Sequence, residues 1–435
     1  MKSRTRKKDK INIITLGCSK NMVDSEVLSG QLHANHMDVV HENTRLDHNI
    51  VIVNTCGFID KAKEESINTI LDQVELKKKG KLDKVYVTGC LSERYKNNLE
   101  AEIPEVDAFF GTMELPALLA TLNADYKTEL VGERLLSTPS HYAYMKISEG
   151  CNRTCSFCAI PLMRGQHRSK PIEELVTEAK RLVQSGVKEI MLIAQELTYY
   201  GLDLYKERRL PDLLRQLARV EGIEWIRLHY AYPSKFPIDI IDVMKEEPKI
   251  CNYLDMPLQH ASDRMLNAMK RQITQQQMRD LIADIRNRIP SICLRTTLIA
   301  GFPGETREDV EELKQFLSDM QFDRVGIFTY SHEEDTGAYA LEDTLSAEEK
   351  ESRAQEIIEF QQEISYEKNQ RRVGEVLNVI VDKKEAGRYI GRTEFDSVEV
   401  DNEVIIRTTR TLHPGDFVQV RITTAYDYDL EGELL

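Results

Sequence analysis

Three cysteines within eight residues form the most chemically suggestive stretch of the sequence. Cys151, Cys155 and Cys158 make a Cys-x3-Cys-x2-Cys motif. Sulfur ligands this close together favour a soft metal site, such as zinc, copper(I) or an iron–sulfur cluster. A structural zinc site needs four ligands in two close pairs, and the sequence has no second Cys-x2-Cys pair. A four-iron cluster normally takes four thiolates, so a set of three would leave one iron open to another ligand. Three buried cysteines with only a packing role are the alternative.

Three further cysteines follow similar segments nearer the N-terminus. The runs INIITLGC, IVIVNTCGF and KVYVTGC each end at a cysteine and precede a helical stretch. Short buried strands that alternate with helices predict a parallel α/β sheet, and ligand sites in such sheets lie beyond the carboxyl ends of the strands. We therefore expect Cys18, Cys56 and Cys90 to converge as a second site of three thiolates, again with one iron open.

Glycines stand beside all three of these N-terminal cysteines. Gly17, Gly57 and Gly89 fit the tight turns and the close backbone approach that such loops need. Asn21 and Asn54 lie nearby, where they could orient ligands or serve as turn residues.

The composition limits the classes of protein to which the chain can belong. With 435 residues, 41% hydrophobic and 30% charged, the chain predicts a soluble protein of several domains. No apolar run approaches the roughly 18 residues of a membrane span. The basic start MKSRTRKKDK lacks the apolar segment of a signal peptide, so we expect a cytoplasmic protein with no membrane association and with cysteines used as ligands rather than disulfides. The net charge of -14 argues against stable nucleic-acid binding through broad electrostatics.

The central region alternates strands with helices in about six β/α units. A complete barrel of this kind needs eight, so we expect an open, partial (β/α)6 barrel with its active side at the carboxyl ends of its strands. Cys251 and Cys293 lie within apolar strands and are expected to be inert core residues. The predicted strands are 142–148, 189–195, 225–231, 253–259, 293–302 and 324–331, and the predicted helices are 171–186, 211–220, 278–289, 307–317 and 346–371, with capping-box sequences at Thr306 and Ser346.

The C-terminal region changes to short alternating strands, typical of a small all-β barrel. The residues from 372 to 435 hold 8 Lys and Arg against 13 Asp and Glu. Such an acidic surface repels phosphates and attracts basic protein segments. The predicted strands are 374–382, 388–395, 397–401, 404–408 and 416–430.

These patterns predict three domains joined in series. The expected division is a basic disordered tail at 1–10, a parallel α/β domain at 11–128, a linker at 129–141, the partial barrel at 142–371 and the small β-barrel at 372–435.

The Cys151 motif, with Phe157 directly before its third cysteine, resembles the radical S-adenosylmethionine (SAM) enzymes. With both triads and the terminal barrel, nearly all of residues 11–435 resembles the methylthiotransferases, which carry an N-terminal cluster domain, a radical SAM domain and a TRAM domain. The motifs CSFCAIPLMRG, LDMPLQHAS, GFPGET and AYDYDLEGEL look like the branch that modifies an aspartate of ribosomal small-subunit protein twelve. Ser156 and His260 fit that branch rather than the branch that modifies tRNA adenosine.

The resemblance implies two [4Fe–4S] clusters and a two-part reaction. One SAM methylates a sulfur at the open iron of the Cys18/Cys56/Cys90 cluster. A second SAM, at the Cys151/Cys155/Cys158 cluster, yields a 5'-deoxyadenosyl radical that removes hydrogen from the aspartate β-carbon, which then takes the methylthio group. Arg164 and Arg168 are candidates to hold a carboxylate, either that of SAM or that of the target aspartate. The candidate SAM contacts are Phe157, beside the cluster, and five residues expected at strand ends that face the site, namely Gln195, Gln259, Arg295, Gly301 and Glu305.

Two other functions remain open on sequence grounds. A tRNA adenosine methylthiotransferase would share both cysteine triads, although the acidic barrel favours a protein substrate. A two-cluster electron carrier or binding protein would gain nothing from an open iron, so complete cluster ligation would be expected there. For the favoured function we expect a monomer whose partners are an electron donor and the ribosomal protein, either free or in the ribosome.

Overall fold

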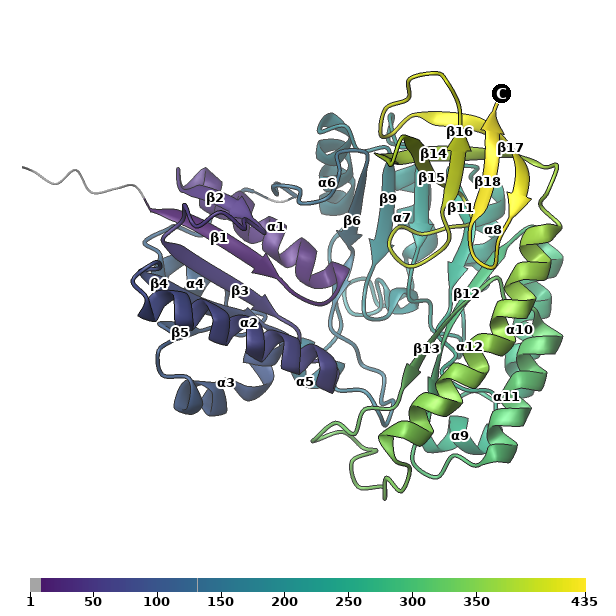
Figure 1. Ribbon diagram of the computed structural model, residues 1–435, viewed down its shortest axis with the longest axis horizontal. Coiled ribbons are helices and arrows are strands. Elements are labelled where there is room, and N and C mark those ends of the chain that lie inside the picture. Colours follow the sequence, from purple (N-terminus) through teal and green to yellow (C-terminus); the bar gives the residue numbers. More distant parts are fainter. Residues whose placement is uncertain (1–8, 131) are drawn as a thin grey trace, which may run out of the picture.

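The computed structural model describes residues 9–130 and 132–435, which form three units in series (Figure 1). Residues 1–8 of the predicted tail and residue 131 of the predicted linker lie outside the described part. Lys10, the last residue of the predicted tail, already begins the first strand. Within the described residues, no helix combines the length and the apolar character that crossing a membrane requires.

The N-terminal unit is a five-stranded parallel sheet in the order β2-β1-β3-β4-β5. Its three central strands are the three predicted ones, and the two edge strands were missed because they are short. Every residue of β3 is buried, since helices cover both faces of the sheet and apolar side chains pack on each. The strands are β1 Lys10–Thr15, β2 Asp38–His41, β3 Ile50–Thr55, β4 Lys84–Gly89 and β5 Ala108–Phe109, and the helices are α1 Ser19–Ala34, α2 Asp60–Lys78, α3 Cys90–Glu102 and α4 Leu115–Thr121.

The central unit is an open six-stranded parallel sheet in the order β13-β12-β11-β10-β9-β6. The six predicted strands and the partial barrel are confirmed. The short helix α8, between β10 and β11, was not predicted. The strands are β6 Tyr142–Lys146, β9 Glu189–Ile193, β10 Trp225–Leu228, β11 Ile250–Asp255, β12 Cys293–Ala300 and β13 Arg324–Thr329, and the helices are α5 Ile160–Arg164, α6 Ile172–Gln184, η1 Leu197–Tyr199, α7 Leu210–Ala218, α8 Asp239–Glu246, α9 Asp263–Ala268, α10 Gln275–Arg288, α11 Arg307–Met320 and α12 Ala347–Gln370.

Helix caps confirm two of the predicted helix starts. Thr306 and Asp309 form a complete capping box at the start of α11. The Ser346 hydroxyl accepts a hydrogen bond from the Glu349 backbone N–H at the start of α12. The long helix α12 then runs across the central unit to the last domain (Figure 1).

The C-terminal unit is a closed five-stranded barrel in the order β14-β15-β16-β18-β17. The prediction of a strand at 397–401 is wrong, because this segment is a turn whose polar side chains form hydrogen bonds with the central unit. The predicted strand at 416–430 covers β17 and the first residue of β18, with a turn between them. The strands are β14 Val376–Glu385, β15 Arg388–Thr393, β16 Val404–Arg407, β17 Phe417–Ala425 and β18 Leu430–Leu434.

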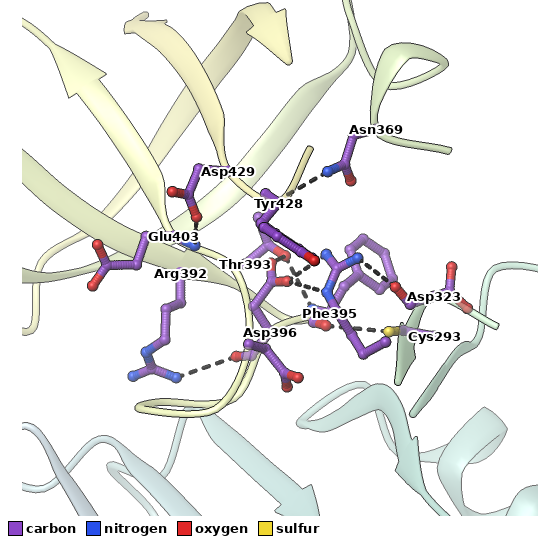
Figure 2. A network of polar contacts seen from close by, with 12 residues as sticks. Cys293, Asp323, Asn369, Arg392, Thr393, Phe395, Asp396, Glu403, Tyr428 and Asp429 are labelled. Carbon is purple, nitrogen blue, oxygen red and sulfur yellow. Dashed lines mark hydrogen bonds and ion pairs between the residues drawn. The ribbon is translucent and has the colours of Figure 1, made fainter. Parts of the chain in front are cut away.

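The loop of residues 394–403, which we call the plug loop, packs on the face of the central sheet opposite the helices. Phe395 joins an apolar cluster with Trp225, Tyr253 and Cys293, while the main core under the helices takes the alternate side chains of the same strands. Figure 2 shows the Cys293 thiol meeting the Phe395 carbonyl, at 3.2 Å, and Arg392 reaching the Asp396 carbonyl. The terminal barrel therefore completes the core of the central unit. Cys251 and Cys293 are both 1% exposed, in agreement with the predicted core role.

All three units meet at one apolar contact. Val23 of α1, Tyr144 of β6, Met191 of β9 and Val398 of the plug loop belong to a single buried cluster. The units are therefore packed together rather than strung on free linkers.

Candidate active site

The second cysteine triad lies in a loop that a small hairpin closes. β7 (Ser148–Glu149) pairs with β8 (Arg168–Ser169), so the residues between these two strands form one closed loop that follows β6. Burial raises the pKa of the Cys151 thiol to about 11 and that of Cys158 to about 12, and the neighbouring Cys155 acts in the same direction on both. The three thiols therefore lie close enough to influence one another's ionisation.

Cationic and aromatic side chains lie around Cys155, and two of them, Arg271 and Tyr232, come from outside the motif. Arg271 Nη1 lies 3.2 Å from the Cys155 sulfur, and the Tyr232 hydroxyl lies 3.6 Å from it. The guanidinium of Arg153 stacks on Tyr232, 3.8 Å from the ring centre, and pairs with Glu196 at 3.0 Å. These groups favour a negatively charged cluster. No local sequence signal points to Arg271, because more than a hundred residues separate it from the motif.

The first triad lies at the carboxyl ends of three neighbouring strands, as expected. Cys18 precedes α1, Cys56 follows β3 and Cys90 begins α3. Burial raises the pKa of the Cys56 thiol and raises that of Cys90 to about 12; the Cys18 thiol adds to both shifts, and that of Cys56 adds to the shift of Cys90. Cys18 remains exposed. These mutual effects place the three sulfurs around one shared space.

The three glycines let these loops approach closely. A Cβ on Gly17 would lie 2.7 Å from Cys56 Cβ, and one on Gly57 would lie 2.8 Å from the Leu91 backbone. Gly89 has φ +101°, and its Cβ would lie 2.5 Å from the Thr55 carbonyl oxygen. Any side chain at these positions would push the cysteine loops apart.

The side chains of the two predicted asparagines form hydrogen bonds that hold the same loops together. Asn21 Nδ2 donates to the carbonyls of Leu16 and Thr55, at 2.7 and 3.0 Å. Asn54 Nδ2 donates to the Asn21 carbonyl at 2.9 Å. Both side chains therefore orient the loops that carry the cysteines.

Both donor sets fit iron–sulfur clusters better than single ions. In the described part of the chain, no three His, Cys, Asp or Glu side chains are arranged to hold one metal ion. In a four-iron cluster each thiolate binds a different iron, so the sulfurs stand further apart than the ligands of one ion. Two separated sets of three thiols agree with that requirement.

The short helix α5 links the loop of the second triad to a cysteine of the first. Ala159, which follows Cys158 and caps α5, and Met163 of α5 pack on Cys90 in one buried cluster. Thr112 of the N-terminal unit donates a hydrogen bond to the Met163 carbonyl at 2.8 Å. The segment that follows the second triad therefore packs on a cysteine of the first at the junction of the first two units.

Three of the predicted SAM residues lie beside this region. Phe157 packs against the cluster of Met265, Phe302 and Tyr330. Gln195 donates to Glu149 Oε1 at 2.6 Å, while its own Oε1 is buried and has no hydrogen-bond partner among the described residues. Gln259 adopts φ +78° and bridges to β12. Their contact with SAM stays a prediction.

The other three predicted SAM residues are engaged within the protein. The Glu305 carboxylate accepts from the Gly301 N–H at 3.0 Å and pairs with Arg353 at 3.0 Å. It also lies 3.4 Å from Nε2 of the buried His260. Arg295 is the third residue of β12, so its predicted place at the end of that strand is wrong. Its guanidinium pairs with Asp255 and Asp401, at 3.1 and 3.2 Å, because the side chain faces the plug loop.

The remaining predicted residues also have defined places. Ser156 Oγ donates to the Ala268 carbonyl at 2.7 Å. Arg168 is exposed and contacts Met113 Sδ. Arg164 pairs with a carboxylate of the chain itself, that of Asp24 in the N-terminal unit, at 2.6 Å; its contact with SAM or the target aspartate stays a prediction.

The fold and the cysteine loop define a radical SAM protein. A family model described as the radical SAM superfamily matches residues 145–317, one described as uncharacterized protein family UPF0004 matches 10–111, and a TRAM domain model matches 373–435. The solved structure of the radical SAM methyltransferase TsrM from Kitasatospora setae, with cobalamin and a [4Fe-4S] cluster bound, has a TM-score of 0.54 at 13% identity, over 85% of this chain and 80% of that one. At that identity the likeness shows the fold.

Full-length relatives identify the family. The ribosomal protein uS12 methylthiotransferase RimO of Christiangramia forsetii is 60% identical over 100% of this chain and 96% of its own length. That of Flavobacterium johnsoniae is 59% identical over 100% of both chains. The chain belongs to the uS12 methylthiotransferase family. Membership carries SAM and [4Fe–4S] clusters as cofactors.

Proposed function

We propose that the protein adds a methylthio group to the β-carbon of an aspartate in ribosomal protein uS12. The observation that supports the proposal is the packing of the loop of the second cysteine triad, through α5, on Cys90 of the first triad. Relatives that are 60% and 59% identical over the whole chain carry the name of this activity.

The cysteines would hold the clusters, Cys18, Cys56 and Cys90 in one and Cys151, Cys155 and Cys158 in the other. With SAM bound, these groups supply the radical and the methylthio group. The chain positions them and keeps water away from the reacting atoms. Phe157 packs beside the second site, and the unpartnered Gln195 Oε1 is a buried acceptor that a SAM amino group would satisfy.

Charge supports a protein substrate over tRNA. The protein carries a net charge of -14, and residues 372–435 hold 13 acidic against 8 basic side chains. A negative surface repels phosphates and attracts a basic protein. We further propose that the enzyme acts in the cytoplasm as a monomer, takes electrons from a separate donor and meets uS12 either free or in the ribosome.

The test is transfer to a peptide. The protein is reconstituted anaerobically, incubated with SAM, a reductant and a uS12 peptide that contains the target aspartate, and the peptide mass is read. The proposal predicts the gain of one methylthio group, which Cys18→Ala and Cys155→Ala each abolish.

Cys251→Ala is the matched control. It removes a buried cysteine that belongs to neither triad, so transfer should survive. Modification of tRNA in place of the peptide would support the adenosine alternative. Intact SAM after incubation would refute the radical mechanism.

A further inference from the structure

Arg164 is the last residue of α5, and its side chain reaches from the loop of the second cysteine triad to the first triad. It follows Cys158 by six residues and is 4% exposed. Its Nε donates to the Cys90 sulfur at 3.2 Å. One side chain on the loop of the second triad thus contacts a cysteine of the first.

The N-terminal unit fixes this guanidinium on its other two nitrogens. Nη1 pairs with Asp24 Oδ2 at 2.6 Å, and Nη2 donates to the side-chain oxygen of Asn21. Asp24 is held in turn by Lys146. Burial opposes ionisation of Asp24, but Lys146 and Arg164 outweigh it and lower its pKa. The carboxylate therefore stays charged and keeps Nε aimed at Cys90.

We propose that Arg164 is a positioning residue that raises the reduction potential of the cluster held by Cys90. The proposal deepens the proposed function, since it assumes that the first triad holds a [4Fe–4S] cluster. A hydrogen bond to a ligating sulfur stabilises the reduced and more negative state of a cluster. The guanidinium suits this role because it stays protonated even when buried.

The position of Arg164 also makes the first site depend on the second. The donor reaches Cys90 only while α5 sits against the N-terminal unit, and α5 continues the chain from Cys158. A shift of the second cysteine loop would therefore withdraw the donor from the first cluster.

The test measures the first cluster alone in the full-length protein. A parent variant with Cys151→Ala, Cys155→Ala and Cys158→Ala keeps only the first triad. After anaerobic reconstitution, its midpoint potential is read by redox titration followed by electron paramagnetic resonance. Adding Arg164→Gln should shift the potential to more negative values and change the resonance spectrum. Arg164→Lys retains the charge without the planar fork, so its shift should be smaller.

Arg168→Gln is the matched control, because it removes the same charge from the same segment. Arg168 is exposed and contacts Met113 rather than a triad cysteine, so its potential should equal that of the parent. Asp24→Asn loosens Arg164 without removing it and should shift the potential in the same direction. This variant provides the answer if Arg164→Gln does not fold.

Two results would overturn the inference. If the parent assembles a cluster and neither Arg164→Gln nor Asp24→Asn moves its potential, Arg164 has only a structural role and the proposed function stands. If the parent assembles no cluster, the inference fails together with the assignment of the first triad.

Discussion

At the residue scale, the first cysteine site depends on three glycines, which have no side chain. Gly17, Gly57 and Gly89 leave space that the facing loops fill, so the distance between those loops is set by the absence of side chains. The same residues that bring the thiols together are therefore intolerant of the smallest substitution.

Gly89→Ala should remove the first cluster. The added Cβ would meet Asn54 and the Thr55 backbone at 2.5 Å, so the Cys56 and Cys90 loops must separate. We expect roughly half of the wild-type iron after reconstitution. Gly80→Ala is the control, because Gly80 also has positive φ, at +70°, but nothing within 4 Å of the new Cβ. It should cost about 1 kcal/mol of stability and leave the iron content unchanged.

The buried His229 predicts a pH dependence of stability. Burial lowers its pKa, although Asp255 opposes the shift, so the ring is neutral in the folded protein. The unfolded chain takes up a proton below a pH of about 6.5. The free energy of unfolding should therefore fall as the pH drops from about 6.5 towards the folded pKa, by up to about 1.4 kcal/mol per pH unit for this group.

His229→Asn should make that slope shallower in urea unfolding between about pH 7.5 and about pH 5.5. His413→Asn, which changes an exposed histidine on the terminal barrel, should leave the slope as in the wild type. An unchanged slope for His229→Asn would show that another group carries the dependence.

At the element scale, the plug loop shows how a short segment can act as part of another domain. Its residues 397–401 have the β-branched alternation of a strand, yet they form a turn. Ser397 Oγ contacts His229 at 3.0 Å, and Asp401 accepts from the Tyr253 hydroxyl at 2.7 Å. These contacts with the central sheet outweigh the local strand preference.

Asp396→Ala should undock the plug loop. Asp396 pairs with Arg324 at 2.6 Å, and both side chains are almost fully buried. Removing one partner of a buried pair costs about 3 to 5 kcal/mol. The single tryptophan is a convenient probe, because Trp225 meets Phe417 of the terminal barrel edge to face at 4.9 Å. Its fluorescence should change at a lower urea concentration than in the wild type.

Val400→Ala is the control within the same loop, because Val400 is 53% exposed. Its urea transition should match the wild type. A wild-type transition for Asp396→Ala would mean that the other contacts of the loop, those of Phe395, Ser397 and Asp401, hold it without the Asp396–Arg324 pair.

Most of the fold, but only part of the candidate site, could be predicted from the sequence. Strands such as β3 and β12 were predictable because the spacing of apolar residues and the strand preference of each residue type can be read from a short stretch of sequence. The six triad cysteines were predictable because their spacing and strand-end positions are visible in the chain. Arg271 was not, since it reaches Cys155 only after folding. Arg295 was misplaced because its partner Asp401 lies in another domain.

At the scale of the whole molecule, two groups of ion pairs hold the N-terminal unit against the central one. In one group Asp24 binds Lys146 and Arg164. In the other, Glu333 of the central unit binds Lys63 at 2.9 Å and Arg94 at 2.5 Å. The cysteine junction therefore has charged contacts from two separate segments of the central unit.

Glu333→Gln should loosen the second of these contacts. The Glu333 side chain is 2% exposed, so its loss leaves Arg94 buried without its counter-charge, at a cost of about 3 kcal/mol. Hydrogen–deuterium exchange should rise in the first turns of α2 and α3. Glu334→Gln is the control, because only the backbone carbonyl of that exposed residue receives Arg94. Equal exchange in the two variants would show that the Glu333 carboxylate does not hold the junction.

The position of the plug loop in the chain has a consequence for biosynthesis. Domains fold from the N-terminus as they leave the ribosome, but the buried Arg324 has to wait for Asp396, which is made 72 residues later. Until then the central sheet carries an arginine without its counter-charge and an uncovered apolar face. A chain that stops before the plug loop is therefore expected to be cleaved by proteases more readily than the full-length protein.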